Sequence, residues 1–230
     1  IEVYEEEDFS VTWNGNQGDN FDASAQAGAP QNAALATMGT TPFGSSELGL
    51  GIHLVKHVND GLYGNSNSWI SSLGLGGAPG EEEEFIGLNF GKAIPVSAIA
   101  WGRDNGNTET DACGGTCKDR SLGIYTLQYT QLDNPGADTE DTEEADSGWQ
   151  TIATVQYLAN APEDFVPYLR HHFEIAQGDD GAPIVATGIR IKVSDGMIAI
   201  DELEIYPTGE EREPGDPNVK PTNEEATIAI

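Results

Sequence analysis

The chain has 230 residues, with 39 Asp and Glu against 10 Lys and Arg, so its formal net charge is −29. Binding to phosphates needs a basic surface, so this charge excludes a nucleic-acid-binding role and disfavours anionic membrane surfaces. With 28 Gly, 12 Pro and no apolar stretch long enough to cross a membrane, the composition favours one turn-rich β domain with a substantial core.

The first fifty residues contain one predicted strand and a long loop. Phe9, Val11 and Trp13 alternate with polar residues, a pattern typical of a strand with one buried face. Residues 14–50 are rich in Gly, Ala, Asn and Ser and show little periodicity. Because long structureless loops are uncommon in compact domains, we expect part of this segment to pack on the core, with one short helix near residues 32–38.

Strand-like segments then recur as far as residue 207. They are residues 85–90, 96–103, 120–129, 149–153, 168–175 and 188–206. In the last segment an apolar alternation ends at Val193, Ser194-Asp195-Gly196 has the composition of a tight turn, and a second alternation begins at Ile200. This pattern predicts a two-stranded hairpin with Glu202 in the middle of its second strand.

The order and spacing of these segments resemble the discoidin-type domain, also called the coagulation-factor C-type or galactose-binding-like domain. The resemblance is carried by Asp60-Gly61 before Trp69, by Tyr-Thr-Leu-Gln-Tyr at 125–129, by Trp-Gln-Thr-Ile at 149–152 and by the closing segment. It covers roughly residues 51–207 and implies an all-β, discoidin-like jelly-roll β-sandwich with an extended N-terminal segment. We divide the chain into a strand-like segment (1–8), the sandwich (9–207) and an acidic, Pro-rich tail (208–230) that ends in a strand-like run.

The resemblance implies a structural calcium ion where the Asp-Gly loop meets the last strand. The corresponding residues are Asp60, Leu62 through its carbonyl, Asn67, Asp201 and Glu202. Mixed carboxylate and carbonyl oxygens are ligands that suit Ca²⁺. The alternative is that Asp60 only caps a turn. We favour calcium, because a carboxylate within an apolar strand is costly unless it is paired or bound to a metal.

A second ion site is a weaker hypothesis. The segment after Arg103 places oxygen-bearing side chains at Asp104, Asn107, Glu109 and Asp111, close to the alternate spacing of calcium loops. It lacks the downstream bidentate Glu of an EF-hand, so a solvated acidic loop is the favoured interpretation.

The two cysteines, Cys113 and Cys117, lie in the sequence Cys-Gly-Gly-Thr-Cys. We expect a small loop-closing disulfide formed in an oxidising compartment. The alternatives are a redox pair or half of a metal site, for which no further ligand lies nearby in the sequence.

Modules of the resembled family bind glycans at the loop end of the sandwich. The candidate residues here are His53, His57, Tyr63, Trp101, Arg103 and Arg120. However, Trp69, Trp101 and Trp149 stand where the family buries its tryptophans, so we expect all three in the core. No nucleophile elbow, zinc-protease motif or phosphate loop occurs, and we expect the chain to be non-enzymatic.

Both ends of the chain contain short apolar runs. The apolar residues are Ile1, Val3 and Tyr4 at one end and Ile228 and Ile230 at the other. The first residue is not Met, and we therefore expect a processed or excised piece. Three interpretations compete: a tandem array, addition of a terminal strand to a neighbouring copy, and docking of the ends on their own domain.

These patterns lead to one main functional hypothesis and one alternative. The main hypothesis is a secreted, calcium-stabilised, non-catalytic subunit of an extracellular assembly (filament, sheath, surface layer or tandem array), with copies of itself or neighbouring repeats as partners. The large negative charge supports it, because cations or a saline setting would relieve self-repulsion. The alternative is a carbohydrate-binding or adhesion module, possibly an accessory domain of a glycan-degrading enzyme, with extracellular glycans as partners. Both place the chain outside the cell or at its surface, without membrane insertion.

Overall fold

The computed structural model describes residues 11–13, 32–49, 51–62, 68–72, 84–102, 123–137, 147–157, 170–175, 183–193 and 198–207. The strands are β1 (Val11–Trp13), β2 (Thr41–Gly44), β3 (Trp69–Ile70), β4 (Glu84–Gly102), β5 (Gly123–Thr130), β6 (Trp149–Tyr157), β7 (Arg170–Ile175), β8 (Ile184–Val193), β9 (Ala199–Ile200) and β10 (Leu203–Pro207). Two short 3-10 helices, η1 (Ala36–Met38) and η2 (Val55–Asn59), complete the regular structure of these residues. The all-β class predicted from the sequence is confirmed.

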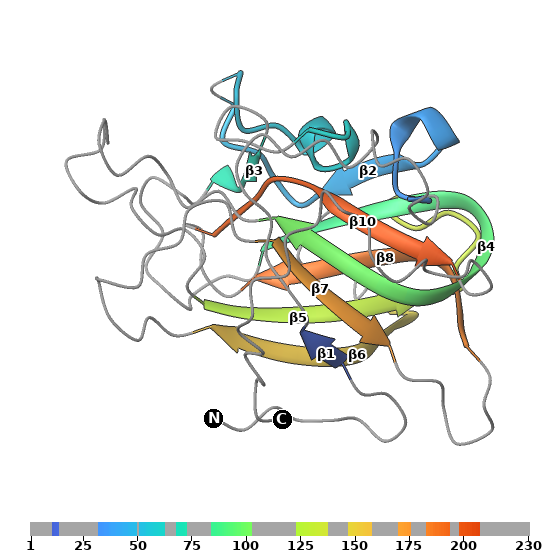
Figure 1. Ribbon diagram of the computed structural model, residues 1–230. Helices are drawn as coiled ribbons and strands as arrows, with labels where there is room; N and C mark the ends of the chain where they lie inside the picture. The colour runs from blue at the N-terminus through green and yellow to red at the C-terminus, as the bar shows by residue number, and fades with distance from the viewer. Residues whose placement is uncertain are drawn as a thin grey trace, which may run out of the picture.

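The strands form two antiparallel layers that share the long strand β4 (Figure 1). The first half of β4 pairs with β2 and β8, and β8 continues to β5 and then β6. The last part of β4 pairs with β10 on one side and β7 on the other, and β7 pairs with β1. The register with β8 is irregular between Asn89 and Ile94, and Gly91 has φ +66° there, so β4 bends at this corner. It continues to pair with β8 as far as Val96 and pairs with β7 from Ala98 onward.

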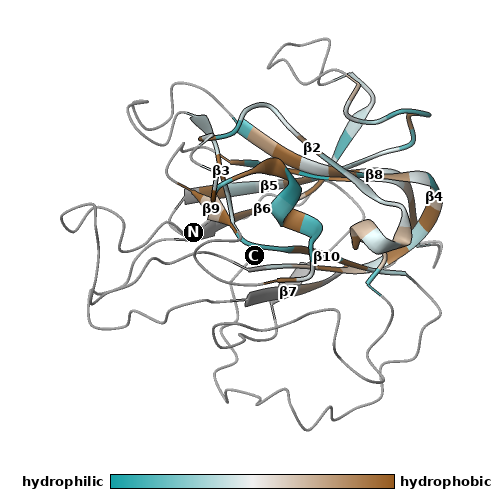
Figure 2. Ribbon diagram, turned by 90° about the horizontal axis from the view of Figure 1, so that it is seen from above, coloured by the Kyte–Doolittle hydropathy of each residue, from teal (hydrophilic) through white to brown (hydrophobic). Residues whose placement is uncertain are grey.

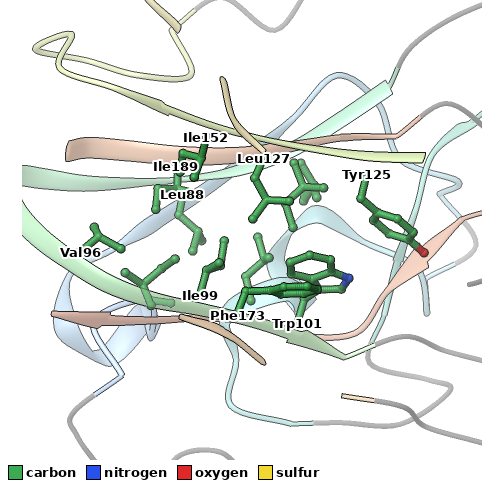
Figure 3. Packing of buried hydrophobic residues seen from close by; sticks show 14 of the residues in the cluster. Leu88, Val96, Ile99, Trp101, Tyr125, Leu127, Ile152, Phe173 and Ile189 are labelled. Carbon is green, nitrogen blue, oxygen red and sulfur yellow. The ribbon is translucent and has the colours of Figure 1, made fainter. Parts of the chain in front are cut away.

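The core lies between the two layers and takes alternate residues from β4, β5, β7 and β8 among the described strands. Leu88, Leu127 and Ile189 reach it from the first layer, and Ile99 and Phe173 from the second, all at most 1% exposed (Figure 3). The same alternation appears along the strands in Figure 2, where apolar residues recur between polar ones. The hydrophobic periodicity at residues 189–193 therefore identified the buried face of β8 correctly.

The predicted hairpin at 188–206 is wrong. β8 pairs with β4 and β5 in the first layer, whereas β10 pairs with β4 in the second layer, and β9 pairs with β3. Asp201 and Glu202 lie between β9 and β10 rather than inside a strand. A period of two identifies a strand and its buried face, but it does not identify the strand's partner.

Several other expectations can be compared with the described residues. The strand at 11–13 is confirmed, and the strand-like segments 120–129 and 149–153 overlap β5 and β6, which pair with each other. Segments 85–90 and 96–103, expected as two strands, belong to the single strand β4. The helix expected near 32–38 is reduced to the turn η1, and β2 was not predicted. None of the described helices is long and apolar enough to cross a membrane.

Of the three tryptophans expected in the core, Trp69 and Trp101 are buried and Trp149 is not. Trp69 and Trp101 are buried, at 0% and 1% exposure. Trp149 is half-buried and lies on the outer face of the first layer, where its ring is 4.4 Å from the guanidinium carbon of Arg190. The reason is that Trp149 is paired with Thr130, which faces away from the core.

Candidate metal centre

The Asp-Gly loop and the segment before β10 meet at one end of the sandwich. The Gly61 N–H donates to both carboxylate oxygens of Glu202, at 3.2 Å each. Gly61 has φ +86°, a conformation that glycine adopts without strain. The Leu62 N–H donates to Asp60 Oδ1 at 2.9 Å, which closes the turn before the chain leaves this site. Residues 141 positions apart in the sequence are thereby brought into contact.

The surrounding chain holds this loop in place. The buried side chain of Asn59 donates to the carbonyls of Ala34 and Thr40, at 3.0 and 3.1 Å. On the other side, β3 pairs with β9 through Trp69 and Ile200, and Ile200 directly precedes Asp201 and Glu202 in the chain. The Trp69 ring N–H donates to the Ser46 carbonyl at 2.8 Å. Both sides of the candidate site are therefore anchored to buried residues, which favours a preformed site.

Burial makes the charge on Glu202 unfavourable. The residue is 0% exposed, and desolvation raises the pKa of its carboxyl group well above the ordinary value. The neighbouring carboxylates of Glu204, Asp60 and Asp201 raise that pKa further, while the Gly61 N–H opposes them. An ionised Glu202 would need a nearby cation to offset these effects, and the alternative in the folded protein is protonation.

Asp60 experiences a milder version of the same effect. Burial raises the pKa of its carboxyl group. The Leu62 N–H and the positive charges of His57 and Lys56 act in the opposite direction. Asp60 lies at the exposed rim of the site, whereas Glu202 lies inside it.

The structure brings together three of the five predicted calcium ligands, namely Asp60, Asp201 and Glu202, close enough for their charges to interact. Leu62 adjoins them, with its side chain 45% exposed, and Asn67 lies outside the described residues. Within the described ranges, no three His, Cys, Asp or Glu side chains form a group that could hold a metal by themselves. An ion at this site would therefore need backbone carbonyls as well, which is a ligand mixture that suits Ca²⁺.

Sequence analysis missed Glu204. It is 0% exposed, its charge acts on Glu202, and it accepts a hydrogen bond from the Tyr206 hydroxyl. The signal was present in the sequence, because residues two apart in an extended segment share a face.

Two of the candidate glycan-binding residues are not accessible. Trp101 stacks in the core on Phe173 and Tyr125, with ring centroids 4.5 and 5.6 Å away. His53 is 4% exposed, with its Nδ1 2.8 Å from Ser68 Oγ. Neither side chain can reach a ligand at the surface, because each is enclosed by the packing around it. His57 is half-buried, with its Nδ1 3.1 Å from the Ile52 carbonyl.

The remaining candidate residues lie outside the described part of the chain. They are Tyr63, Arg103 and Arg120 for glycans, Asp104, Asn107, Glu109 and Asp111 for a second ion, Cys113 and Cys117 for the disulfide, and Ile1, Val3, Tyr4, Ile228 and Ile230 for assembly. These hypotheses, including the structural-assembly role that depends on the terminal strands, stay predictions.

Comparison with known proteins gives similarity only at the level of solved structures. No family model matches the chain, and no curated protein matches it. Chitosan-binding module 1 of a chitosanase/glucanase from Paenibacillus sp. IK-5 is 17% identical, with a TM-score of 0.46 over 76% of this chain and 98% of that one. A family 32 carbohydrate-binding module from C. perfringens, solved with galactose, is 19% identical, with a TM-score of 0.44 over 75% and 97%.

The lectin domain of lectinolysin, solved with Lewis B antigen, is 12% identical, with a TM-score of 0.47 over 78% of this chain and 99% of that one. TM-scores below 0.5 at these identities carry no argument about the fold or the ligand of this chain. The similar structures are carbohydrate-binding modules and a lectin domain.

Proposed function

We propose that this chain is a non-catalytic carbohydrate-binding module of an extracellular protein, with a calcium ion that stabilises one end of its sandwich. The observation that carries the calcium part is the fully buried Glu202 carboxyl group, with the charges of Asp60, Asp201 and Glu204 acting on it. The glycan part is supported by the order of discoidin-type motifs in the sequence and by the two-layer sandwich that those motifs form.

Calcium fits the chemistry of this end of the molecule. The side-chain groups that act on Glu202 are carboxylates, and the loop at 60–62 adds backbone carbonyls. Hard oxygen donors of this kind favour Ca²⁺ over softer transition metals. A bound ion would join the Asp-Gly loop to the start of β10 and would stabilise this end of the sandwich.

Calorimetric titration tests the calcium part. Chelator-treated protein titrated with CaCl₂ is expected to give saturable binding, and Asp60→Asn is expected to weaken it by about tenfold or more, because a charged ligand is lost. Glu47→Gln is the matched control, since Glu47 is an exposed carboxylate of the neighbouring loop that accepts the Val55 N–H at 2.9 Å. Absence of calcium binding by the wild-type protein would refute this part.

A glycan array tests the other part. The calcium-loaded protein is expected to retain a restricted group of oligosaccharides and to turn over none of them. An array without any binding, with calcium present, would overturn the carbohydrate-binding proposal and leave the calcium site intact.

A further inference from the structure

Four neutral polar side chains form a ladder on the outer face of strands β5 and β6. Thr126 pairs with Thr154, and Gln128 pairs with Thr151. The two threonine hydroxyls of the first pair are 3.5 Å apart, and Gln128 Nε2 donates to Thr151 Oγ1 at 3.2 Å. All four side chains are half-buried, and they point away from the core, because the residues between them on β5 point into it.

Trp149 lies at one end of this ladder in a fixed position. Its ring is 4.4 Å from the guanidinium carbon of Arg190 and 6.0 Å from the ring of Phe43. Arg190 is itself held by Gln128, which accepts its Nε–H at 2.8 Å, and by the ring of Phe85 at 4.9 Å. A ring held on one side by a buried cation loses little conformational freedom when a ligand binds, which favours affinity.

The charge of this face sets it apart from the rest of the chain. No residue of β5 or β6 is charged, although the chain contains 39 Asp and Glu. The adjacent strand β8 contributes Arg190 and Lys192, which are only 1% and 7% exposed. An anionic ligand, or a second copy of a chain with net charge −29, would be repelled by the molecule as a whole. A cationic ligand would find no carboxylate among the described residues of β5 and β6.

We propose that this polar face, formed by Thr126, Gln128, Thr151, Thr154 and Trp149, is a binding site for a neutral glycan chain. The inference rests on the proposed carbohydrate-binding function and places it on the sheet rather than on the loops at the calcium end. Sugar hydroxyls both donate and accept hydrogen bonds, as threonine hydroxyls and a glutamine amide do. The apolar C–H face of a sugar ring packs on an indole, which Trp149 supplies at one end of the ladder.

The test uses the calcium-loaded full chain and hexasaccharide fragments of β-glucan, xylan, galactan and chitin. The double variant Thr126→Ala/Thr154→Ala removes two hydroxyls from the face and keeps the strands uncharged. It is expected to weaken binding of the retained hexasaccharide at least about fivefold, the usual effect of losing one net hydrogen bond. The matched control is Thr41→Ala, an exposed threonine on β2 in the same layer, which is expected to leave binding unchanged.

A spectroscopic measurement separates contact from general destabilisation. The indole N–H resonance of Trp149, assigned by its disappearance in Trp149→Phe, is expected to shift during titration with the bound hexasaccharide. Resonances of Trp69 and Trp101 serve as internal controls, because both rings are buried.

The outcomes distinguish this inference from the function on which it rests. If the wild-type chain retains no hexasaccharide, the carbohydrate-binding function fails, and the inference fails with it. If the chain binds, but Thr126→Ala/Thr154→Ala has no effect while Tyr63→Ala abolishes binding, the function stands and the sheet-face site is refuted. Weakened binding together with a shift of the Trp149 resonance supports the site.

Discussion

Replacement of Glu202 by Gln is expected to have opposite effects with and without calcium. The Glu202 carboxyl group is 0% exposed, and Glu204, Asp60 and Asp201 all disfavour its charge. Without an ion, the wild-type carboxyl group at neutral pH is either charged without compensation or protonated at a free-energy cost, whereas Gln is neutral and keeps an oxygen for the Gly61 N–H. We therefore expect Glu202→Gln to stabilise the calcium-free protein by about 1–3 kcal/mol at neutral pH.

With calcium bound, we expect the wild-type protein to be more stable than Glu202→Gln. At a calcium concentration about a thousandfold above the dissociation constant, binding stabilises the wild-type protein by about 4.1 kcal/mol, which exceeds the advantage of the variant in chelator. The variant loses a charged ligand and most of this gain. The free energy of unfolding, measured by urea denaturation in chelator and in CaCl₂, should therefore favour the variant in the first condition and the wild type in the second.

Two results would refute this reasoning. If Glu202→Gln destabilises the protein equally in both conditions, Glu202 acts only as an anchor for Gly61, and no ion is needed. If calcium leaves both proteins unchanged, the site is not a calcium site. Glu47→Gln, at an exposed carboxylate that accepts the Val55 N–H, is the control and should change stability by about 0.5 kcal/mol or less in either condition.

Three further predictions follow from the same structure. The pKa of Glu202 is raised in the calcium-free folded protein. Above pH 4.5, the ordinary value for a glutamate, the unfolded chain therefore loses the proton from this carboxyl group while the folded protein still holds it. Stability in chelator should therefore fall as pH rises from about 4.5 through the folded pKa, and a pH-independent series of urea midpoints would contradict this. Gly87→Ala would place a Cβ 2.5 Å from the Phe43 ring and 2.8 Å from the Ile189 carbonyl, so it should destabilise the protein by about 1–3 kcal/mol in urea denaturation, and no loss would argue against this packing. Trp69→Phe removes the 2.8 Å hydrogen bond to the Ser46 carbonyl, and thermal unfolding should show a loss of about 1–3 kcal/mol, whereas an unchanged melting temperature would mean that the bond contributes nothing.

The sequence by itself determined most of the strands and the face that β8 buries. Ile189 and Ile191 alternate with Arg190 in the sequence, and in the structure both isoleucines are 0% exposed in the core while Arg190 lies on the outer face. A β-strand turns successive side chains to opposite faces, so this information is local and can be obtained from the sequence. The resemblance also paired Asp60 with Glu202, and the Gly61–Glu202 hydrogen bonds place them together.

Only the tertiary structure decided which strands are neighbours. β8 and β10 are close in sequence but do not pair with each other, because β4 pairs with β8 as far as Val96 and with β10 from Val96 onward. The position of Trp149 depends on its pairing with Thr130 of β5 and on its contact with Arg190 of β8. Both residues are distant from Trp149 in the sequence. Strand partners and register are set by hydrogen bonds and packing between distant segments, and a periodic pattern within one segment contains no information about them.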